Sequence, residues 1–100
     1  MNIFNFFKGN KMKMGAKHIL VDQEFEAKDL LNKINDGEAF ENLAKDFSKC
    51  GSAAQGGDLG TFGKGMMVKD FEDAVIALDV DKVSEPVKTQ FGFHIIKRTV

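Results

Sequence analysis

Cysteine is nearly absent from this 100-residue sequence, which contains only Cys50. One thiol cannot form an internal disulfide, so a disulfide-stapled fold is excluded. A lone free thiol is typical of a reducing compartment, and it predicts a cytoplasmic protein. No apolar run approaches the roughly 18 residues that a membrane-spanning helix needs. The apolar stretch 3–7 is too short for a signal-peptide core and lacks a small-residue cleavage site.

Acidic residues are missing from the first 21 positions, which carry four lysines: Lys8, Lys11, Lys13 and Lys17. The net charge of the whole chain is −1, so the remainder is acidic. A nucleic-acid-binding domain normally shows a basic face on its folded part, and we therefore expect no nucleic-acid partner. Residues 1–14 predict a flexible basic and aromatic N-terminal tail, with weak contact to a membrane surface left open. Residues 15–100 predict one monomeric domain.

Three segments show the i, i+3, i+4, i+7 spacing of apolar residues that is typical of an amphipathic helix. Their stripes are Ala27, Leu30, Leu31 and Ile34; Phe40, Leu43, Ala44 and Phe47; and Phe71, Ala74, Val75 and Leu78. Gly37 is predicted to end the first helix in a left-handed conformation. Asp70 is predicted to cap the N-terminus of the third helix.

Two β-prone runs, 17–21 and 93–97, predict central strands. Residues 59–62, within a glycine-rich stretch, predict a short strand, and residues 83–89 predict an edge strand because they contain Pro86. The predicted order is a strand, two helices, a loop with a short strand, a helix and two strands. Helices packed against a mostly antiparallel sheet make an α+β domain.

His18 and His94 lie in the middle of the two predicted central strands. Each can be an ordinary interior histidine, but pairing of the strands can also bring the two imidazoles within hydrogen-bonding distance. Zinc needs three or four ligands, and spacings such as C-x-x-C or H-E-x-x-H are missing, so we expect no metal and no cofactor. Cys50 beside two histidines leaves a thiol nucleophile open, although no cysteine-hydrolase motif surrounds it. The stretch 56–60 lacks the lysine and Ser/Thr of a phosphate-binding loop.

A series of short motifs runs in one register from residue 16 to residue 96. They are A-x-H-I-L-V at 16–21, F-x-x-L-A-x-x-x-S at 40–48, Cys50 with Ser52, G-G-D-L-G-x-F at 56–62, Met67 with F-E-D-A at 71–74, V-S-E-P-V at 83–87 and T-Q-F-G-F-H-I-I at 89–96. In order and spacing they resemble a parvulin-type peptidyl-prolyl cis/trans isomerase (rotamase) domain over about residues 15–100. The resemblance implies a parvulin-like four-stranded antiparallel sheet surrounded by helices, in the order βαααβαββ.

The resemblance also implies roles for individual side chains. The catalytic positions are the paired histidines of the central strands, the polar position beside the prolyl bond, and the hydroxyl that bonds to the histidine pair; these are His18 and His94, Cys50, and Thr89. The substrate-binding positions are Leu59, Met67, Phe71 and Phe91. The chain departs from the family pattern at Met66, Asp70 and Phe91, the last replacing the serine of phosphate-directed members.

Phosphate-directed parvulins use a basic loop after the first strand to hold a phosphorylated residue before proline. This chain has Asp22, Glu24 and Glu26 there instead, and these acids would repel a phosphate. We therefore expect a domain that is not phosphate-directed and that prefers an apolar residue before proline.

Rotation about a prolyl bond needs no covalent chemistry, only relief of a barrier of about 18–20 kcal/mol that comes from amide resonance. The predicted function is non-covalent isomerisation of Xaa-Pro bonds in peptides and in unfolded or flexible protein segments, as a protein-folding helper. Proline-containing polypeptides are the expected partners. Two alternatives stay open: a non-catalytic chaperone or proline-segment binding module that uses the same cleft, and a thiol-dependent hydrolase centred on Cys50.

Overall fold

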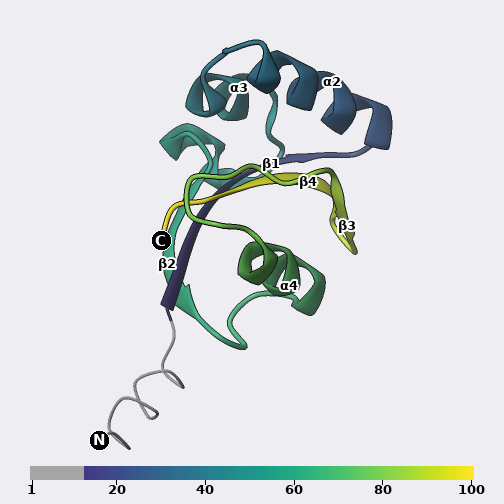
Figure 1. Cartoon of the computed structure of the whole chain (residues 1–100). Helices are drawn as coiled ribbons and strands as arrows, with labels where there is room; N and C mark the ends of the chain where they lie inside the picture. Colours follow the sequence, from purple (N-terminus) through teal and green to yellow (C-terminus); the bar gives the residue numbers. More distant parts are fainter. Residues whose placement is uncertain (1–12) are drawn as a thin grey trace, which may run out of the picture.

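The computed structural model describes residues 13–100. Its elements are β1 (Lys13–Val21), α2 (Glu24–Asn35), α3 (Phe40–Phe47), the 3-10 helix η1 (Gly51–Gln55), β2 (Asp58–Gly63), α4 (Lys69–Ala77), β3 (Val87–Thr89) and β4 (Gly92–Arg98). All strand pairs are antiparallel, in the sheet order β2-β1-β4-β3 (Figure 1). The α+β class and the order βαααβαββ are thus confirmed, with η1 as the third helix.

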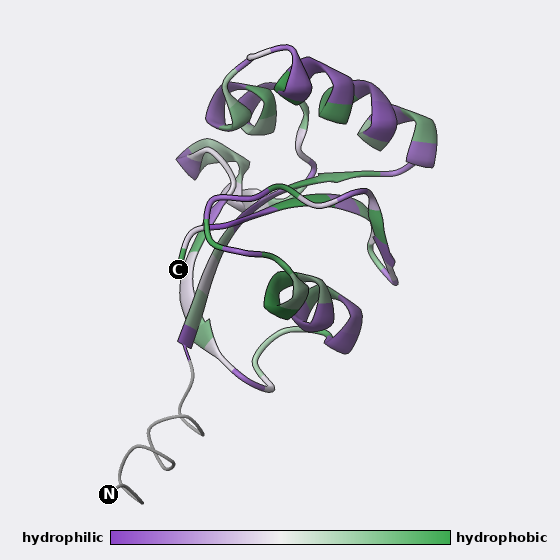
Figure 2. Ribbon diagram, viewed as in Figure 1, coloured by the Kyte–Doolittle hydropathy of each residue, from purple (hydrophilic) through white to green (hydrophobic). Residues whose placement is uncertain are grey.

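The helices cover both faces of the sheet: α2 and α3 lie on one side and α4 on the other (Figure 1). Successive side chains of a strand point to opposite faces, so β1 and β4 supply two separate cores. The core under α2 and α3 contains Ile19, Val21 and Ile95. The core under α4 contains Ala16, Ile96 and Phe71. Hydrophobic residues alternate with hydrophilic ones along α2, as one buried face requires (Figure 2).

The same alternation places His18 on the α4 face of the sheet, and a close backbone contact fixes its position. The N–H of His18 donates to the carbonyl oxygen of Gly57 at 2.9 Å. A Cβ atom on Gly57 would lie 2.3 Å from the carbonyl oxygen of His18, and the φ of Gly57 is +85°. Only glycine fits this approach and this backbone conformation. The segment between α3 and β2 is therefore held directly against β1.

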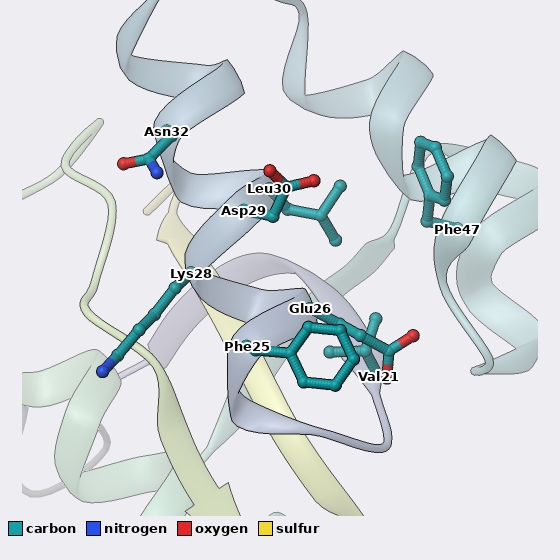
Figure 3. Close-up of a pocket in the computed structure, with 8 residues that line it drawn as sticks. All are labelled: Val21, Phe25, Glu26, Lys28, Asp29, Leu30, Asn32 and Phe47. Atoms are coloured by element: carbon teal, nitrogen blue, oxygen red, sulfur yellow. The ribbon is translucent and has the colours of Figure 1, made fainter.

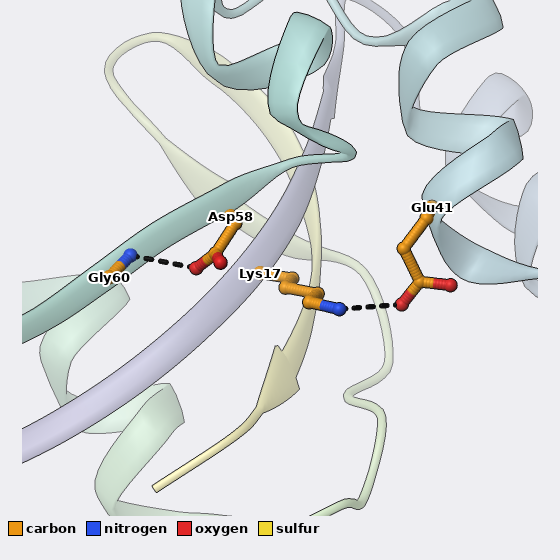
Figure 4. A network of polar contacts seen from close by, with 4 residues as sticks. All are labelled: Lys17, Glu41, Asp58 and Gly60. Atoms are coloured by element: carbon orange, nitrogen blue, oxygen red, sulfur yellow. Dashed lines mark hydrogen bonds and ion pairs between the residues drawn. The ribbon is translucent and has the colours of Figure 1, made fainter.

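Two polar contacts lie near the middle of β1, one of them to β1 itself and one within the neighbouring strand β2 (Figure 4). The Nζ of Lys17 lies 2.7 Å from a carboxylate oxygen of Glu41, which joins β1 to α3. The N–H of Gly60 donates to Oδ1 of Asp58 at 2.8 Å at the start of β2. Asp58 also pairs with Lys17 in the register of β2 and β1, so β2 lies beside the strand that carries His18.

Two details of the predicted helices are wrong. Asp70 does not cap α4, because the helix begins at Lys69 and Val68 occupies the cap position without a side-chain hydrogen bond. Asp70 lies in the first turn, where a carboxylate still interacts favourably with the helix dipole. Phe47 is 49% exposed rather than buried, because α3 ends at this residue.

The boundary of the predicted tail also shifts. The strand β1 begins at Lys13, and Met14 is fully buried, so both belong to the sheet rather than to the tail. The rest of the predicted tail lies outside the described residues. No helix among residues 13–100 has the length and apolar character needed to cross a membrane.

Candidate active site

A cavity of about 410 Å³ opens on the α4 face of the sheet. Its walls come from β1, β2, β4, α4, the start of η1, the loop before α4 and the turn between β3 and β4. The lining residues are His18, Leu20, Cys50, Leu59, Met66, Met67, Val68, Phe71, Phe91 and His94. None of them carries a lysine, arginine, aspartate or glutamate side chain, so the cavity is an apolar cleft with two imidazoles and one thiol.

The two histidines form a hydrogen-bonded pair, although their strands place them two positions apart in register. The Nδ1 atoms of His18 and His94 are 2.9 Å apart, and Nε2 of His94 lies 2.7 Å from the hydroxyl oxygen of Thr89. That hydroxyl oxygen also accepts from the N–H of Phe91 at 3.2 Å. Both histidines and Thr89 are buried. The pair is therefore anchored to the β3–β4 turn through Thr89.

Phe71 holds the orientation of both imidazoles. Its ring meets His18 edge-on at a centroid distance of 5.4 Å and His94 at 5.3 Å. Edge-to-face contacts of this kind stabilise an aromatic pair beyond the burial of its area. Phe71 thus lies at once against the histidine pair and in the wall of the cleft.

Both imidazoles are neutral at pH 7. Burial, and to a smaller extent the charge of His94, lowers the pKa of His18 to about 4. Burial likewise lowers the pKa of His94 to about 4. The Nδ1–Nδ1 contact needs one donor and one acceptor, so only one of the two rings carries its proton at Nδ1.

Counting hydrogen-bond partners decides which ring that is. If the Thr89 hydroxyl donates to Nε2 of His94, then Nδ1–H of His94 donates to His18, and only the Nε2–H of His18 lacks a partner. The opposite arrangement also leaves the Thr89 hydroxyl proton unpaired among residues 13–100. Unpaired buried polar groups are costly, so the first arrangement is favoured. The threonine hydroxyl then sets the tautomer of both rings.

Seven of the eight site residues expected from the sequence line the cleft together. The eighth, Thr89, lies behind it and contacts His94 rather than the open cavity. The sequence did not indicate Leu20 and Val68 as lining residues, and it marked Met66 only as a departure from the family pattern. Leu20 follows His18 by two positions in β1, so strand alternation was a usable signal for it. Val68 and Met66 lie in a loop, where no periodicity applies.

The acids expected to repel a phosphate at the cleft lie elsewhere. Asp22 pairs with Lys49, and Glu24 pairs with Lys28 at 3.8 Å. Glu26 lines a different cavity, beside α2. The cleft therefore owes its apolar character to its uncharged lining rather than to nearby acids.

Cys50 lies at the rim with its thiol free. No hydrogen bond joins the thiol to either imidazole within residues 13–100, whereas a cysteine nucleophile needs a base within reach. The same residues contain no group of three or more His, Cys, Asp or Glu side chains placed to hold a metal ion. The site is thus suited to binding and polarising a ligand rather than to attacking it.

An antiparallel four-stranded sheet with a histidine pair behind an apolar cleft defines a parvulin-type isomerase domain. The family model described as the PPIC-type PPIase domain (rotamase) matches residues 11–100. The chain belongs to this family.

Relatives and solved structures agree with this assignment. The chain is 52% identical over 96 residues to a foldase protein PrsA of Geobacillus sp. (strain WCH70), with 95% of the chain and 35% of the relative covered. The structure of a peptidylprolyl isomerase (PrsA) from Bacillus anthracis matches with a TM-score of 0.88 and 40% identity, over 98% of this chain and 46% of that one. NmPin, the parvulin of Nitrosopumilus maritimus, matches with a TM-score of 0.79 and 52% identity, over 88% and 96%. The chain thus spans about a third of the length of the curated PrsA relative.

Proposed function

We propose that this chain catalyses the cis/trans isomerisation of Xaa-Pro bonds in flexible or unfolded polypeptides and so assists protein folding. The observation that carries the proposal is the apolar cleft with a neutral, buried histidine pair at its base. The curated relatives are named foldases, which supports a role in folding. The expected monomeric state and cytoplasmic location are part of the proposal, as is weak contact of the tail with a membrane surface. The location rests on the free thiol alone.

The cleft offers a direct route over the rotational barrier. Leu59, Met67 and Phe71 can hold the pyrrolidine ring, while the carbonyl side of the bond turns. A twisted amide has less charge separation than a planar one, so the free-energy barrier between the planar and the twisted form is lower in an apolar site than in water. Each tenfold acceleration requires the barrier to fall by about 1.4 kcal/mol. Cys50 and His18 then shape and polarise the site, and no bond is made or broken.

Turnover separates this function from that of a chaperone that only holds proline segments in the same cleft. An isomerase accelerates prolyl exchange when present at a small fraction of the substrate concentration. A holding protein acts only near one-to-one. Line-shape or exchange NMR on a prolyl tetrapeptide, at about a hundredth of the peptide concentration, measures the difference. Absence of acceleration at that ratio would favour the holding function.

The uncharged lining predicts which residue is preferred before proline. In an Ala-Xaa-Pro-Phe series, leucine, methionine or phenylalanine at Xaa should give a higher kcat/KM than glutamate or phosphoserine. A charged side chain loses bound water when it enters the cleft, and no charged residue of the lining compensates for that loss. Phe91→Lys should narrow the gap between glutamate and leucine, and Gln90→Lys, outside the lining, should not. A faster reaction with glutamate or phosphoserine in the unchanged protein would contradict the assignment.

Cys50 distinguishes a polarising group from a nucleophile. Cys50→Asp should retain substantial isomerase activity, because a carboxylate at this position is polar and can accept a hydrogen bond in place of the thiol. Cys50→Ala, which has no polar side chain, should be impaired but active. If the thiol attacked the bond, both variants would fall to the uncatalysed rate. The measurement is kcat/KM together with thermal unfolding of each variant. A folded but inactive Cys50→Asp protein would reject the non-covalent mechanism.

A further inference from the structure

A second cavity, of about 560 Å³, lies on the opposite face of the sheet from the cleft, between α2 and the end of α3 (Figure 3). Its floor is formed by Val21 and Leu30, which are almost fully buried. Its rims carry two aromatic rings that are largely exposed, Phe25 at 71% and Phe47 at 49%. We call this cavity the α2–α3 groove.

Four polar side chains line the groove: Glu26, Lys28, Asp29 and Asn32. Two of them are acidic, and Oε1 of Glu26 accepts from the N–H of Gln23 at 3.0 Å. The carboxylates of Glu26 and Asp29 line the same cavity as the two aromatic rings, with Glu26 next to Phe25 and Asp29 next to Leu30 (Figure 3). Within residues 13–100, neither forms an ion pair. The one lysine of the lining, Lys28, points away from the groove and pairs with Glu24 (Figure 3). The groove thus combines exposed aromatic surface with two negative charges.

We propose that the α2–α3 groove is a second attachment site for the polypeptide client, and that it takes a segment in which aromatic side chains are followed by lysine or arginine. The aromatic side chains of such a segment pack against Phe25 and Phe47. Its cation meets the carboxylates of Glu26 and Asp29. This charge complementarity is what selects a basic partner segment over an acidic or a purely apolar one.

The groove and the cleft are close enough to hold one client chain. Val21 in the floor of the groove and Leu20 in the cleft are neighbours in β1 and point to opposite faces. Phe47 and Cys50, on the two rims, are three residues apart, which spans at most about 11 Å. A client segment of a few residues therefore bridges the two sites around the end of the sheet.

The proposal rests on the proposed function for its kinetic consequence. A small exposed groove binds weakly, with a dissociation constant of roughly 0.1–1 mM. A tether of a few residues gives an effective concentration on the order of 1 mM at the cleft. Together these values predict a gain of about twofold to tenfold in kcat/KM for a long client, and none for a tetrapeptide too short to reach the groove.

Binding is tested first, without any proline. The full chain, labelled with 15N, is titrated with the peptide Ser-Phe-Ala-Phe-Lys-Lys and with its control Ser-Phe-Ala-Phe-Glu-Glu. We expect the lysine peptide to shift the amide resonances of Phe25, Asp29 and Phe47, and the glutamate peptide to bind at least about fivefold more weakly. Asp29→Lys should abolish the preference for lysine. Glu38→Lys, the same change of charge sign at an exposed position outside the groove, should leave it intact.

Turnover is tested next, with a tetrapeptide and with an unfolded protein whose refolding waits on a prolyl bond and which carries Phe-Lys segments. Asp29→Lys should lower kcat/KM about twofold to tenfold for the protein and leave the tetrapeptide unchanged. A wild-type protein inactive on the tetrapeptide would contradict the proposed function, while the peptide titration would still test the groove.

Other occupants of the groove give distinct results, and each would overturn the proposal. Resonance shifts confined to the cleft would show that the peptide uses only the first site. Groove resonances that change with protein concentration in the absence of peptide would identify a second copy as the occupant. Groove resonances that change when Phe4, Phe6 and Phe7 are replaced with serine would identify the chain's own N-terminal segment.

Discussion

Phe71→Ala is expected to lower kcat/KM on a prolyl tetrapeptide by at least about tenfold and to destabilise the fold by about 3–5 kcal/mol. The side chain is 3% exposed, and it contacts both imidazoles as well as the cleft. Its loss removes the apolar surface that holds the proline ring and also frees the histidine pair to reorient. Activity and chemical unfolding of the same preparation measure the two effects.

A matched substitution separates the two effects. Phe62 is also 3% exposed and belongs to the same core, with a ring centroid 6.4 Å from that of Phe71, but it does not line the cleft. Phe62→Ala should therefore cost similar stability and much less activity. Phe71→Leu, which keeps apolar surface in the cleft, should fall between the wild type and Phe71→Ala. Equal losses of activity from Phe62→Ala and Phe71→Ala in folded protein would show that the cleft wall has no specific role.

Much of the fold follows from spacing that one sequence displays. The apolar spacing of Leu30 and Leu31 correctly predicted a helix, and the β-prone run around Ile19 correctly predicted a strand. Both predictions succeeded because the spacing of apolar residues follows from the burial of one face of the element. The ends of elements were less predictable. Asp70 has the chemistry of a cap, but the cap position fell two residues earlier, at Val68. Phe47 has the spacing of a core residue, but the helix ends there and leaves its ring exposed.

The functional residues were likewise predictable in part: the sequence indicated the histidine pair but not the α2–α3 groove. His18 and His94 were visible as polar residues inside apolar strands, and the pairing of β1 with β4 brings their rings together. The α2–α3 groove was not visible, because Phe25 and Asp29 become neighbours of Phe47 only when α2 packs beside α3. The spacing of apolar residues within one element predicts the face that this element buries. It does not predict a surface that forms where two elements meet.

Lowering the pH from 7 to 5 is expected to reduce the free energy of unfolding by roughly 3–4 kcal/mol through the histidine pair. In the unfolded chain each histidine titrates near its ordinary pKa of 6.5, whereas in the folded protein burial lowers the pKa of both to about 4. Between these values the unfolded state binds more protons than the folded state. The stabilising contribution is therefore complete above about pH 6.5 and is lost as the pH falls toward 4.

This pH window isolates the histidines from the carboxylates. The hydrogen bond from Lys17 lowers the pKa of Glu41 below its ordinary value of 4.5, so that ion pair loses its effect only at more acidic pH. For a domain of this size, 3–4 kcal/mol corresponds to a fall in Tm of roughly 15 °C or more. The activity of the folded protein should stay level over the same range, because the pair keeps its neutral form.

Two measurements test the argument together. Chemical unfolding between pH 7 and pH 5 gives the stability, and the imidazole resonances of His18 and His94 give the two pKa values in the folded protein directly. A flat stability profile would contradict the linkage, and resonances that titrate near pH 6.5 would show that the pair is not desolvated. The expected result has a physical consequence for the site: a pair that costs the fold several kcal/mol on protonation cannot act as a general acid near neutral pH. Its contribution there is the fixed, neutral hydrogen-bond array that Thr89 orients beneath the cleft.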